Sequence, residues 1–240
     1  MTRSQKPYSA DLIKAAEHIA ANQFGKAEAI LRPYVKDNPA DVNGIRLLGE
    51  VGIALGALSD GEKLLARAVE LAPKYTEARY GWANALYKRH RYEEAREQLD
   101  HLLALDSSRL DWRMLKAATL VEVNEYEEAI ELFESVLKLR PDHRQAYLSY
   151  GHALRAVGRT EDCIVAYEKC VEVATGVGEA YYSLANLKTY RFSDEQIAHI
   201  EELLNDSACE FRDYYHLLFS LGKAQDCLLY TSPSPRDKRQ

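Results

Sequence analysis

Three pairs of adjacent carboxylates are the first feature of this sequence that could carry chemistry. The pairs are Glu93/Glu94, Glu127/Glu128 and Glu161/Asp162. Two neighbouring carboxylates suit general acid–base catalysis when their environments separate their pKa values. These pairs recur at a constant interval, however, and each stands early in a segment with helical periodicity. Because the helix dipole stabilises negative charge at a helix N-terminus, we interpret the pairs as structural.

The cysteines and histidines give no spacing typical of a metal or redox site. No two cysteines form C-x-x-C, and no two histidines form H-E-x-x-H. Cys163 and Cys170 lie on one face of one predicted helix. They are either small buried side chains, which we favour, or a reactive or metal-binding pair. We therefore predict no metal ligands and a reducing, cytoplasmic location. The remaining cysteines are Cys209 and Cys227, and the histidines, interpreted as surface or packing side chains, are His18, His90, His101, His143, His152, His199 and His216.

The composition argues against several function classes. The formal net charge of −6 gives no basic patch for nucleic acid. No run reaches the roughly 18 apolar residues of a membrane helix, and the N-terminus has no apolar signal-peptide core. The sequence contains neither a G-x-x-x-x-G-K-[ST] phosphate loop nor a G-x-S-x-G elbow. We predict no catalytic residue, no nucleic-acid partner and no membrane contact.

A regular repeat positions these side chains. Pro39 and Pro73 mark one period of the repeat, and Pro141 follows after two further periods, each at the end of a helical segment. After an N-terminal lead, 1–7, the predicted repeats are 8–41, 42–75, 76–109, 110–143 and 144–177. Small residues recur at the eighth and twentieth positions, and large ones at the twenty-fourth. The eighth are Ala15, Gly49, Ala83, Ala117 and Gly151; the twentieth Ala27, Gly61, Ala95, Ala129 and Cys163; the twenty-fourth Leu31, Leu65, Leu99, Phe133 and Tyr167.

This pattern over 8–177 resembles the tetratricopeptide repeat (TPR), in which each repeat of about 34 residues is a pair of helices, A and B. The resemblance implies an all-α fold, a right-handed superhelical solenoid that binds proteins or peptides. Several positions depart from the family pattern, including Arg79 and Arg113 at the usually large fourth position. Gly61 replaces the usual alanine and should weaken its helix by about 1 kcal/mol. Pro33 should shorten or kink the first helix B.

Residues 178–226 read as a degenerate sixth repeat and the start of a truncated seventh. A helix A follows in register from 178, and a second helix begins at Ser193, with Gln196 completing a capping box. A third helix carries Gly222 as its small residue. Since this last helix lacks a predicted helix B, we expect an exposed apolar face and self-association through the C-terminal end.

The last stretch of the chain, 227–240, breaks the pattern abruptly. Cys227–Asp237 resembles the translation of a transposase-based sequencing adapter over eleven consecutive codons. We interpret this tail as non-native, the end of a metagenomic gene fragment that ran into adapter sequence. The alternative is a natural Ser-Pro tail.

Two short stretches resemble the junction of bacterial TPR–sulfotransferase proteins. They are Ser183–Phe192 and, in the next helix, Phe219, Leu221, Gly222 and Lys223. The resemblance implies a following protein-tyrosine sulfotransferase-like domain that uses the sulfate donor PAPS. No cofactor site or catalytic residue of that domain falls within these 240 residues. The alternatives are a stand-alone TPR adaptor that assembles a protein complex, and the TPR array of another transferase, such as a protein glycosyltransferase.

In the TPR family, helix A lines the concave groove, and the resemblance transfers this role to specific positions. Aromatic side chains offer apolar area with a polar tip, and asparagine can both donate to and accept from a peptide backbone. An ordinary solvated face is the alternative interpretation. The predicted groove residues are Arg46, Glu50, Tyr80, Asn84, Tyr87, Lys88, Met114, His152, Arg155, Tyr182, Asn186 and Tyr190.

Overall fold

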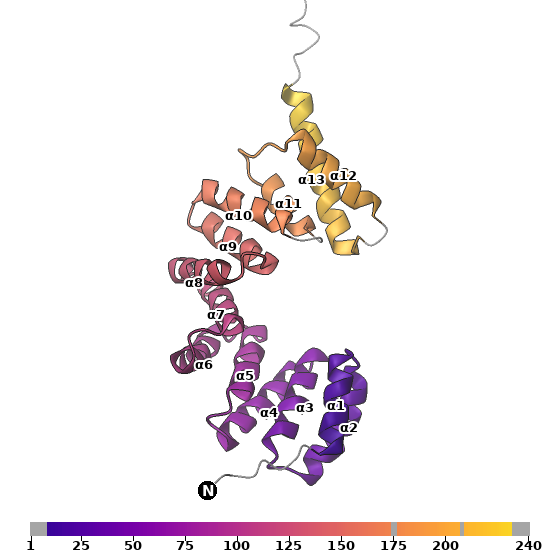
Figure 1. Ribbon diagram of the computed structural model, residues 1–240, viewed down its shortest axis with the longest axis vertical. Helices are drawn as coiled ribbons and strands as arrows, with labels where there is room; N and C mark the ends of the chain where they lie inside the picture. The colour runs from indigo at the N-terminus through magenta and orange to yellow at the C-terminus, as the bar shows by residue number, and fades with distance from the viewer. Residues whose placement is uncertain (1–8, 174–176, 207–208, 232–240) are drawn as a thin grey trace, which may run out of the picture. The chain divides into compact units, whose positions relative to one another are not determined.

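The computed structural model describes residues 9–173, 177–206 and 209–231, and all regular secondary structure in these ranges is helical. The predicted lead, 1–7, and residues 232–240 of the predicted non-native tail lie outside the described residues. Figure 1 shows the order of the helices along the chain. Their bounds are α1 Ala10–Ala20, α2 Phe24–Asp37, α3 Val42–Ala54, α4 Leu58–Leu71, α5 Thr76–Lys88, α6 Tyr92–Leu105, α7 Leu110–Glu122, α8 Tyr126–Leu139, α9 Arg144–Ala156, α10 Thr160–Glu172, α11 Gly178–Ala185, α12 Asp194–Asn205 and α13 Phe211–Thr231.

The helices repeat with the period seen in the sequence. Helix B begins at Phe24 in α2 and recurs at one constant interval, through α4, α6 and α8, to Thr160 in α10. Helix A begins at Val42 in α3 and recurs at the same interval to Arg144 in α9. This recurrence confirms the predicted fold class of all-α tetratricopeptide repeats. Pro33 does not shorten α2, which has 14 residues like α4.

A residue with positive φ stands at the turn inside each of the five regular repeats. Asn22, His90 and Asn124 have φ of 55°, 59° and 63°, and Gly56 and Gly158 have φ of 86° and 79°. These residues follow the same period as the helices, and Asn and Gly are the residue types that tolerate left-handed backbone best. The left-handed turn reverses the chain so that helix B can pack against helix A. His90 therefore has a structural place in the turn.

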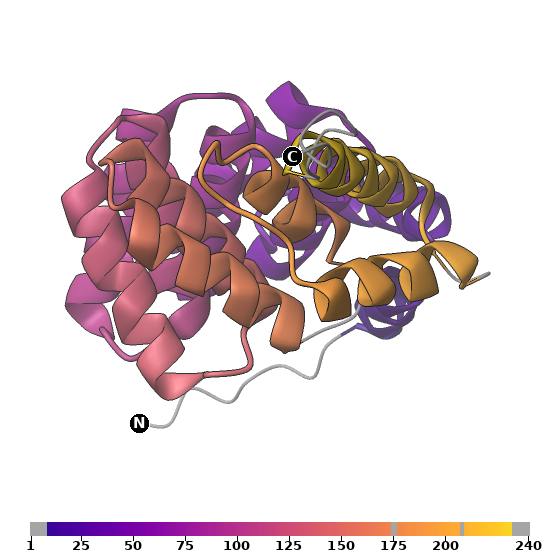
Figure 2. The ribbon, with the colours of Figure 1, turned by 90° about the horizontal axis from the view of Figure 1, so that it is seen from above.

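The chain forms two compact units, Met1–Glu125 and Tyr126–Gln240. In the N-terminal unit, α1 to α7 stack as helix hairpins in which each helix packs against the next. In the C-terminal unit, α9 packs with α8 and α10, and α13 runs alongside α11 and α12 (Figure 2). The side chains at the twenty-fourth position of the repeats are fully buried. They are Leu31, Leu65, Leu99, Phe133 and Tyr167.

Small residues let the two helices of a hairpin approach closely. A Cβ atom on Gly61 would lie 2.7 Å from the carbonyl oxygen of Gly49, and one on Gly151 would overlap the Tyr167 ring. Real Cβ atoms do not approach other atoms so closely, because interiors are already close-packed. The glycine at Gly61 is therefore required by the contact between α3 and α4. This packing role adds to the expected effect of Gly61 on helix propensity and was not predicted from the sequence.

The last three helices differ from the regular repeats. The capping box predicted at Ser193 is present: its side chain accepts from the Gln196 amide, and the Gln196 side chain accepts from the Ser193 amide. Helix α13 buries Leu217, Ser220 and Ala224. Gly222 is exposed, and a Cβ added there would meet no atom within 4 Å. It is therefore not the close-packing residue expected from the sequence, since α13 packs through another face.

Candidate peptide-binding face

In the N-terminal unit, the predicted groove residues lie on the helix A series α3, α5 and α7. Arg46 of α3 is held from two sides, because its guanidinium donates to Glu50 Oε1 at 2.6 Å and to the Tyr75 hydroxyl at 2.8 Å. The Tyr75 hydroxyl in turn donates to Asn43 Oδ1 at 2.7 Å. Burial alone would lower the pKa of Arg46, but Glu50 and Tyr75 raise it overall. This network fixes the side chains of Arg46 and Glu50, the two predicted groove residues of α3.

The tyrosines of α5 are partly buried anchors. Tyr80 packs against the cluster that contains Leu99 and Trp112, and burial raises its pKa, with the carboxylate of Asp111 adding to the effect. The ring of Tyr87 meets the edge of Tyr92 with centroids 5.6 Å apart. Each tyrosine therefore keeps a defined orientation with part of its surface open to solvent.

Asn84 and Lys88 remain available on the same helix. Asn84 is half-buried and Lys88 is exposed. Within the described part of the chain, the Asn84 amide makes no side-chain hydrogen bond and Lys88 forms no ion pair. Met114 of α7 is half-buried nearby in the helix A series. This face therefore combines fixed rings with one free amide and one free ammonium group.

The C-terminal unit places its predicted residues differently. His152 on α9 contacts the Tyr167 hydroxyl through Nδ1 at 2.9 Å, and its Nε2 lies 3.7 Å from Glu179 Oε1. Burial lowers the pKa of His152, and Arg155 lowers it further. Arg155 itself is exposed. His152 is thus engaged within the fold, while Arg155 is open.

Tyr182, Asn186 and Tyr190 do not share one open helical face, which corrects the expectation from the sequence. Helix α11 ends at Ala185, where the Asn186 side chain donates back to the Tyr182 carbonyl at 2.8 Å. Tyr190 lies beyond the helix, and its hydroxyl donates to Glu168 Oε1 at 2.9 Å. The asparagine cap ends the helix, and the tyrosine is directed toward α10 instead of the predicted groove.

Helix α13 covers the side of α11 that was expected to be open. The Tyr182 ring lies 4.9 Å from the rings of both His216 and Phe219. Glu179 pairs with Arg212 at 3.3 Å. Because Glu179 and Tyr182 occupy predicted groove positions of the repeat, α13 of the same chain contacts side chains that were expected to face an open groove. The contact between α11 and α13 was not predicted from the sequence, because the helical period does not determine which helices pack against each other.

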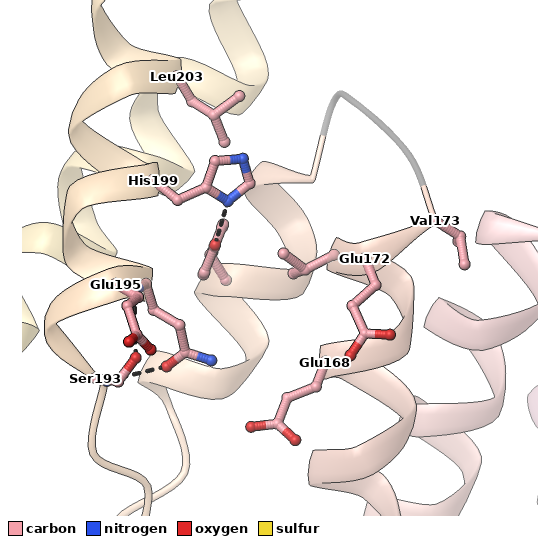
Figure 3. Close-up of a pocket in the computed structure, with 10 residues that line it drawn as sticks. Glu168, Glu172, Val173, Ser193, Glu195, His199 and Leu203 are labelled. Carbon is pink, nitrogen blue, oxygen red and sulfur yellow. Dashed lines mark hydrogen bonds between the residues drawn. The ribbon is translucent and has the colours of Figure 1, made fainter.

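A hollow in the C-terminal unit lies between α10 and α12 and has a volume of about 800 Å³ (Figure 3). The carboxylates of Glu168, Glu172 and Glu195 surround it. His199 Nδ1 lies 2.7 Å from the Tyr181 hydroxyl, so this histidine is a packing side chain. Glu172 is already paired with a lysine and Glu168 with Tyr190. In the described ranges, no three His, Cys, Asp or Glu side chains are grouped to hold a metal ion.

Cys163 and Cys170 are buried, and burial raises the pKa of Cys170 to about 11 and raises that of Cys163. Since the thiolate is the reactive form, we expect both thiols to resist a disulfide reagent at pH 8 in the folded chain and to react after denaturation. Peptide mapping after labelling identifies the modified cysteines. Rapid labelling of either thiol in the folded chain, or zinc binding lost in Cys170→Ser, would instead support a reactive or metal-binding pair.

No helix in the described ranges combines the length and apolarity that crossing a bilayer requires.

Comparisons with known proteins place the repeats in a family. Residues 12–147 match the profile of the cytochrome c-type biogenesis protein H TPR domain, and residues 145–175 match a tetratricopeptide repeat profile. The cytochrome c-type biogenesis protein CcmH of Escherichia coli (strain K12) is 33% identical over 138 residues, which are 55% of this chain and 39% of that protein. The human protein O-mannosyl-transferase TMTC3 is 33% identical over 73 residues, 30% of this chain and 8% of that protein.

Solved structures of MamA share the fold. A crystal structure of MamA has a TM-score of 0.59 at 22% identity, covering 66% of this chain and 93% of MamA. MamA of Desulfovibrio magneticus RS-1 has a TM-score of 0.62 at 15% identity, covering 69% and 96%. The chain spans 39% of the length of the CcmH protein. These matches do not support the resemblance to TPR–sulfotransferase proteins. Because the profile matched over 12–147 covers more than half of the chain, the chain belongs to the family of the cytochrome c-type biogenesis protein H TPR domain.

Proposed function

We propose that the chain is a scaffold that binds a polypeptide segment on the helix A face of its N-terminal unit, as an adaptor in the assembly of c-type cytochromes. The observation that carries this proposal is the family match over 12–147, which includes α3, α5 and α7. The proposed process, the assembly of c-type cytochromes, is taken from the name of the CcmH relatives. This proposal takes up the adaptor alternative rather than the sulfotransferase one.

The chemistry of the face supports an extended peptide. The free amide of Asn84 can donate to and accept from a peptide backbone, and Lys88 can pair with an acidic side chain or a terminal carboxylate. The rings of Tyr80 and Tyr87 offer apolar contact without much loss of side-chain entropy, because packing already holds them. The fixed tyrosine rings would contribute affinity, and the free polar groups of Asn84 and Lys88 would set the register of the bound peptide.

We expect Asn84→Ala and Lys88→Gln to weaken binding of the haem-free polypeptide of a c-type cytochrome. Each should weaken it by about three- to tenfold, since one net hydrogen bond is worth about 1 kcal/mol. Isothermal titration calorimetry gives the affinities. Glu97→Ala, an exposed change on α6, serves as the control. Absence of binding, or equal weakening by the control, would contradict the proposal.

The transferase alternatives receive less support. The match to TMTC3 covers 30% of this chain, and the name of that relative is compatible with a TPR array attached to a transferase. A sulfotransferase with PAPS has only the short resemblance of Ser183–Phe192 and the residues around Lys223 in its favour. A cytoplasmic location likewise remains a prediction.

We also propose that two copies of the chain associate through the outer face of α13. Five large side chains on this helix are exposed, with Phe211 at 77% and Tyr215 at 55%. The others are Tyr214, Leu218 and Phe219. A second copy offers an identical apolar surface, which suits a two-fold symmetric dimer.

We expect Tyr215→Glu combined with Leu218→Glu to abolish this dimer, because the change places charge in the centre of an apolar contact. Sedimentation velocity over a range of concentrations measures the monomer–dimer equilibrium. Leu105→Glu is the matched control, since Leu105 on α6 is 68% exposed. A wild-type chain that stays monomeric, or a control variant that dissociates equally, would show that α13 does not form the contact.

A further inference from the structure

A small cleft of about 290 Å³ lies where the segment after α11 passes beside α13. Its lining includes residues from both of the stretches that stand out in the sequence, Ser183–Phe192 and the region around Lys223. The volume is at the lower end of the range typical of small-molecule sites. The lining residues are Ala185, Asn186, Leu187, Lys188, Tyr190, Arg191, Phe192, Lys223 and Ala224.

The lining carries three cations and no carboxylate. Lys188, Arg191 and Lys223 come from two separate segments and converge on the same hollow. In the part of the chain that the structure describes, none of the three forms an ion pair with an acidic side chain. Many other arginines, such as Arg96, are paired, whereas exposed lysines such as Lys88 also lack an ion pair among the described residues. Unpaired positive charge in a concave site attracts anions.

The cations are not needed to cap the end of α11. The Tyr182 carbonyl accepts from both the backbone and the side chain of Asn186, and the Leu184 carbonyl accepts from the Leu187 amide at 3.0 Å. Arg191 uses one terminal nitrogen, Nη1, for the carbonyls of Lys188 and Tyr190, at 3.2 and 2.9 Å. The rest of its guanidinium is free to donate to a ligand. The partial negative charge at the C-terminus of α11 is also too small to neutralise three full positive charges.

The segment is held in place before any ligand arrives. A turn closes when the Tyr190 amide donates to the Leu187 carbonyl at 3.2 Å. The Tyr190 hydroxyl is fixed by Glu168 at 2.9 Å and by the Gln196 side-chain amide at 2.7 Å. A fixed loop loses little entropy on binding, which favours affinity.

The remaining lining is apolar or aromatic. Leu187, Ala185 and the largely buried Ala224 provide aliphatic surface, and the Phe192 ring meets the Tyr190 ring edge to face at 5.2 Å. The Lys223 ammonium lies 5.9 Å from the centre of the Phe219 ring, on the preceding turn of α13. A charged oxyanion with an attached aromatic ring would contact both the cations and this apolar lining.

We propose that this cleft binds a small organic phosphate: a doubly charged oxyanion held by Lys188, Arg191 and Lys223, joined to an aromatic ring that packs on Leu187 and Phe192. No covalent step is involved. The cleft shares no residue with the helix A face of the N-terminal unit. The proposed phosphate binding therefore does not depend on the proposed peptide binding.

The test uses the complete 240-residue chain and phenyl phosphate as the probe, measured by calorimetry at low salt. We expect phenyl phosphate to bind more tightly than inorganic phosphate, and phenol not to bind. Lys188→Gln combined with Lys223→Gln should weaken binding about tenfold, because each exposed charge contact contributes modestly. These lysines are exposed and unpaired, so their loss leaves the fold intact.

The matched control is Lys74→Gln combined with Lys138→Gln, two exposed lysines outside the cleft that give the same change in net charge. The control should retain wild-type affinity. Shifts of the backbone amide signals of residues 187–192 on titration would place the ligand in the cleft. The proposal is overturned if phenyl phosphate does not bind, if both double variants weaken it equally, or if phenol binds as well as phenyl phosphate.

Discussion

Gly61→Ala is expected to destabilise the N-terminal unit, although alanine favours a helix over glycine by about 1 kcal/mol. The added Cβ would lie 2.7 Å from the carbonyl oxygen of Gly49 and 2.8 Å from a side-chain carbon of Ile53. The first of these atoms belongs to the backbone, so α4 must move away from α3 for the methyl group to fit. Overpacking of this kind costs about 1–3 kcal/mol. After the gain in helix propensity is subtracted, the net loss in unfolding free energy should be up to about 2 kcal/mol.

Tryptophan fluorescence during urea denaturation measures this effect in the relevant unit, because Trp82 and Trp112 both lie within Met1–Glu125. Gly25→Ala on α2 is the matched control, since a Cβ there meets nothing within 4 Å. The control should be neutral or stabilising by up to about 1 kcal/mol. If Gly61→Ala proved as stable as the control, the close approach of α3 and α4 would not be a constraint.

Most of the fold could be predicted from the repeat period of the sequence. Leu31 and its equivalents up to Tyr167 are fully buried because a large residue at a fixed repeat position always meets the same neighbours. The left-handed turn residues show the same period and could have been found in the sequence. Asn22, Gly56 and Asn124 are residue types that favour positive φ.

The degenerate end could not be predicted in the same way. The sequence favours a helix A that continues to Tyr190, but the Asn186 side chain competes for the Tyr182 carbonyl and ends the helix. The position of α13 against α11 depends on contacts between Tyr182 and Phe219 that have no repeat equivalent. Part of the predicted groove was misplaced for this reason, while the residues of α3 and α5 follow the regular pattern.

The ion pairs between neighbouring repeats could be identified only after the fold was known. Glu62 pairs with Arg91 at 2.5 Å, and Arg96 pairs with Glu125 at 2.7 Å. Both pairs join the same two repeat positions, with the charges exchanged. Nothing in the sequence alone says that these positions touch. Their contact follows from how helix B of one repeat meets the turn of the next.

Glu62→Ala is expected to lower the unfolding free energy of the N-terminal unit by about 2 kcal/mol, less than the loss of a fully buried ion pair. The Glu62 side chain is 9% exposed and accepts from both Arg89 and Arg91, which belong to the turn between α5 and α6. Breaking a fully buried ion pair costs about 3–5 kcal/mol. Here the two arginine side chains are 32% and 40% exposed. They regain hydration when Glu62 is removed, so the cost is smaller.

Glu62→Gln should lose less than Glu62→Ala, because the amide oxygen still accepts one hydrogen bond. A double-mutant cycle with Arg89→Ala, read by tryptophan fluorescence in urea, isolates the pair from the packing of the side chain. Lys63→Ala, at an exposed pair with Asp60, should change stability little. If the coupling between Glu62 and Arg89 were no larger than that between Lys63 and Asp60, burial would not strengthen the pair. The contact would then fix the position of the turn without stabilising it.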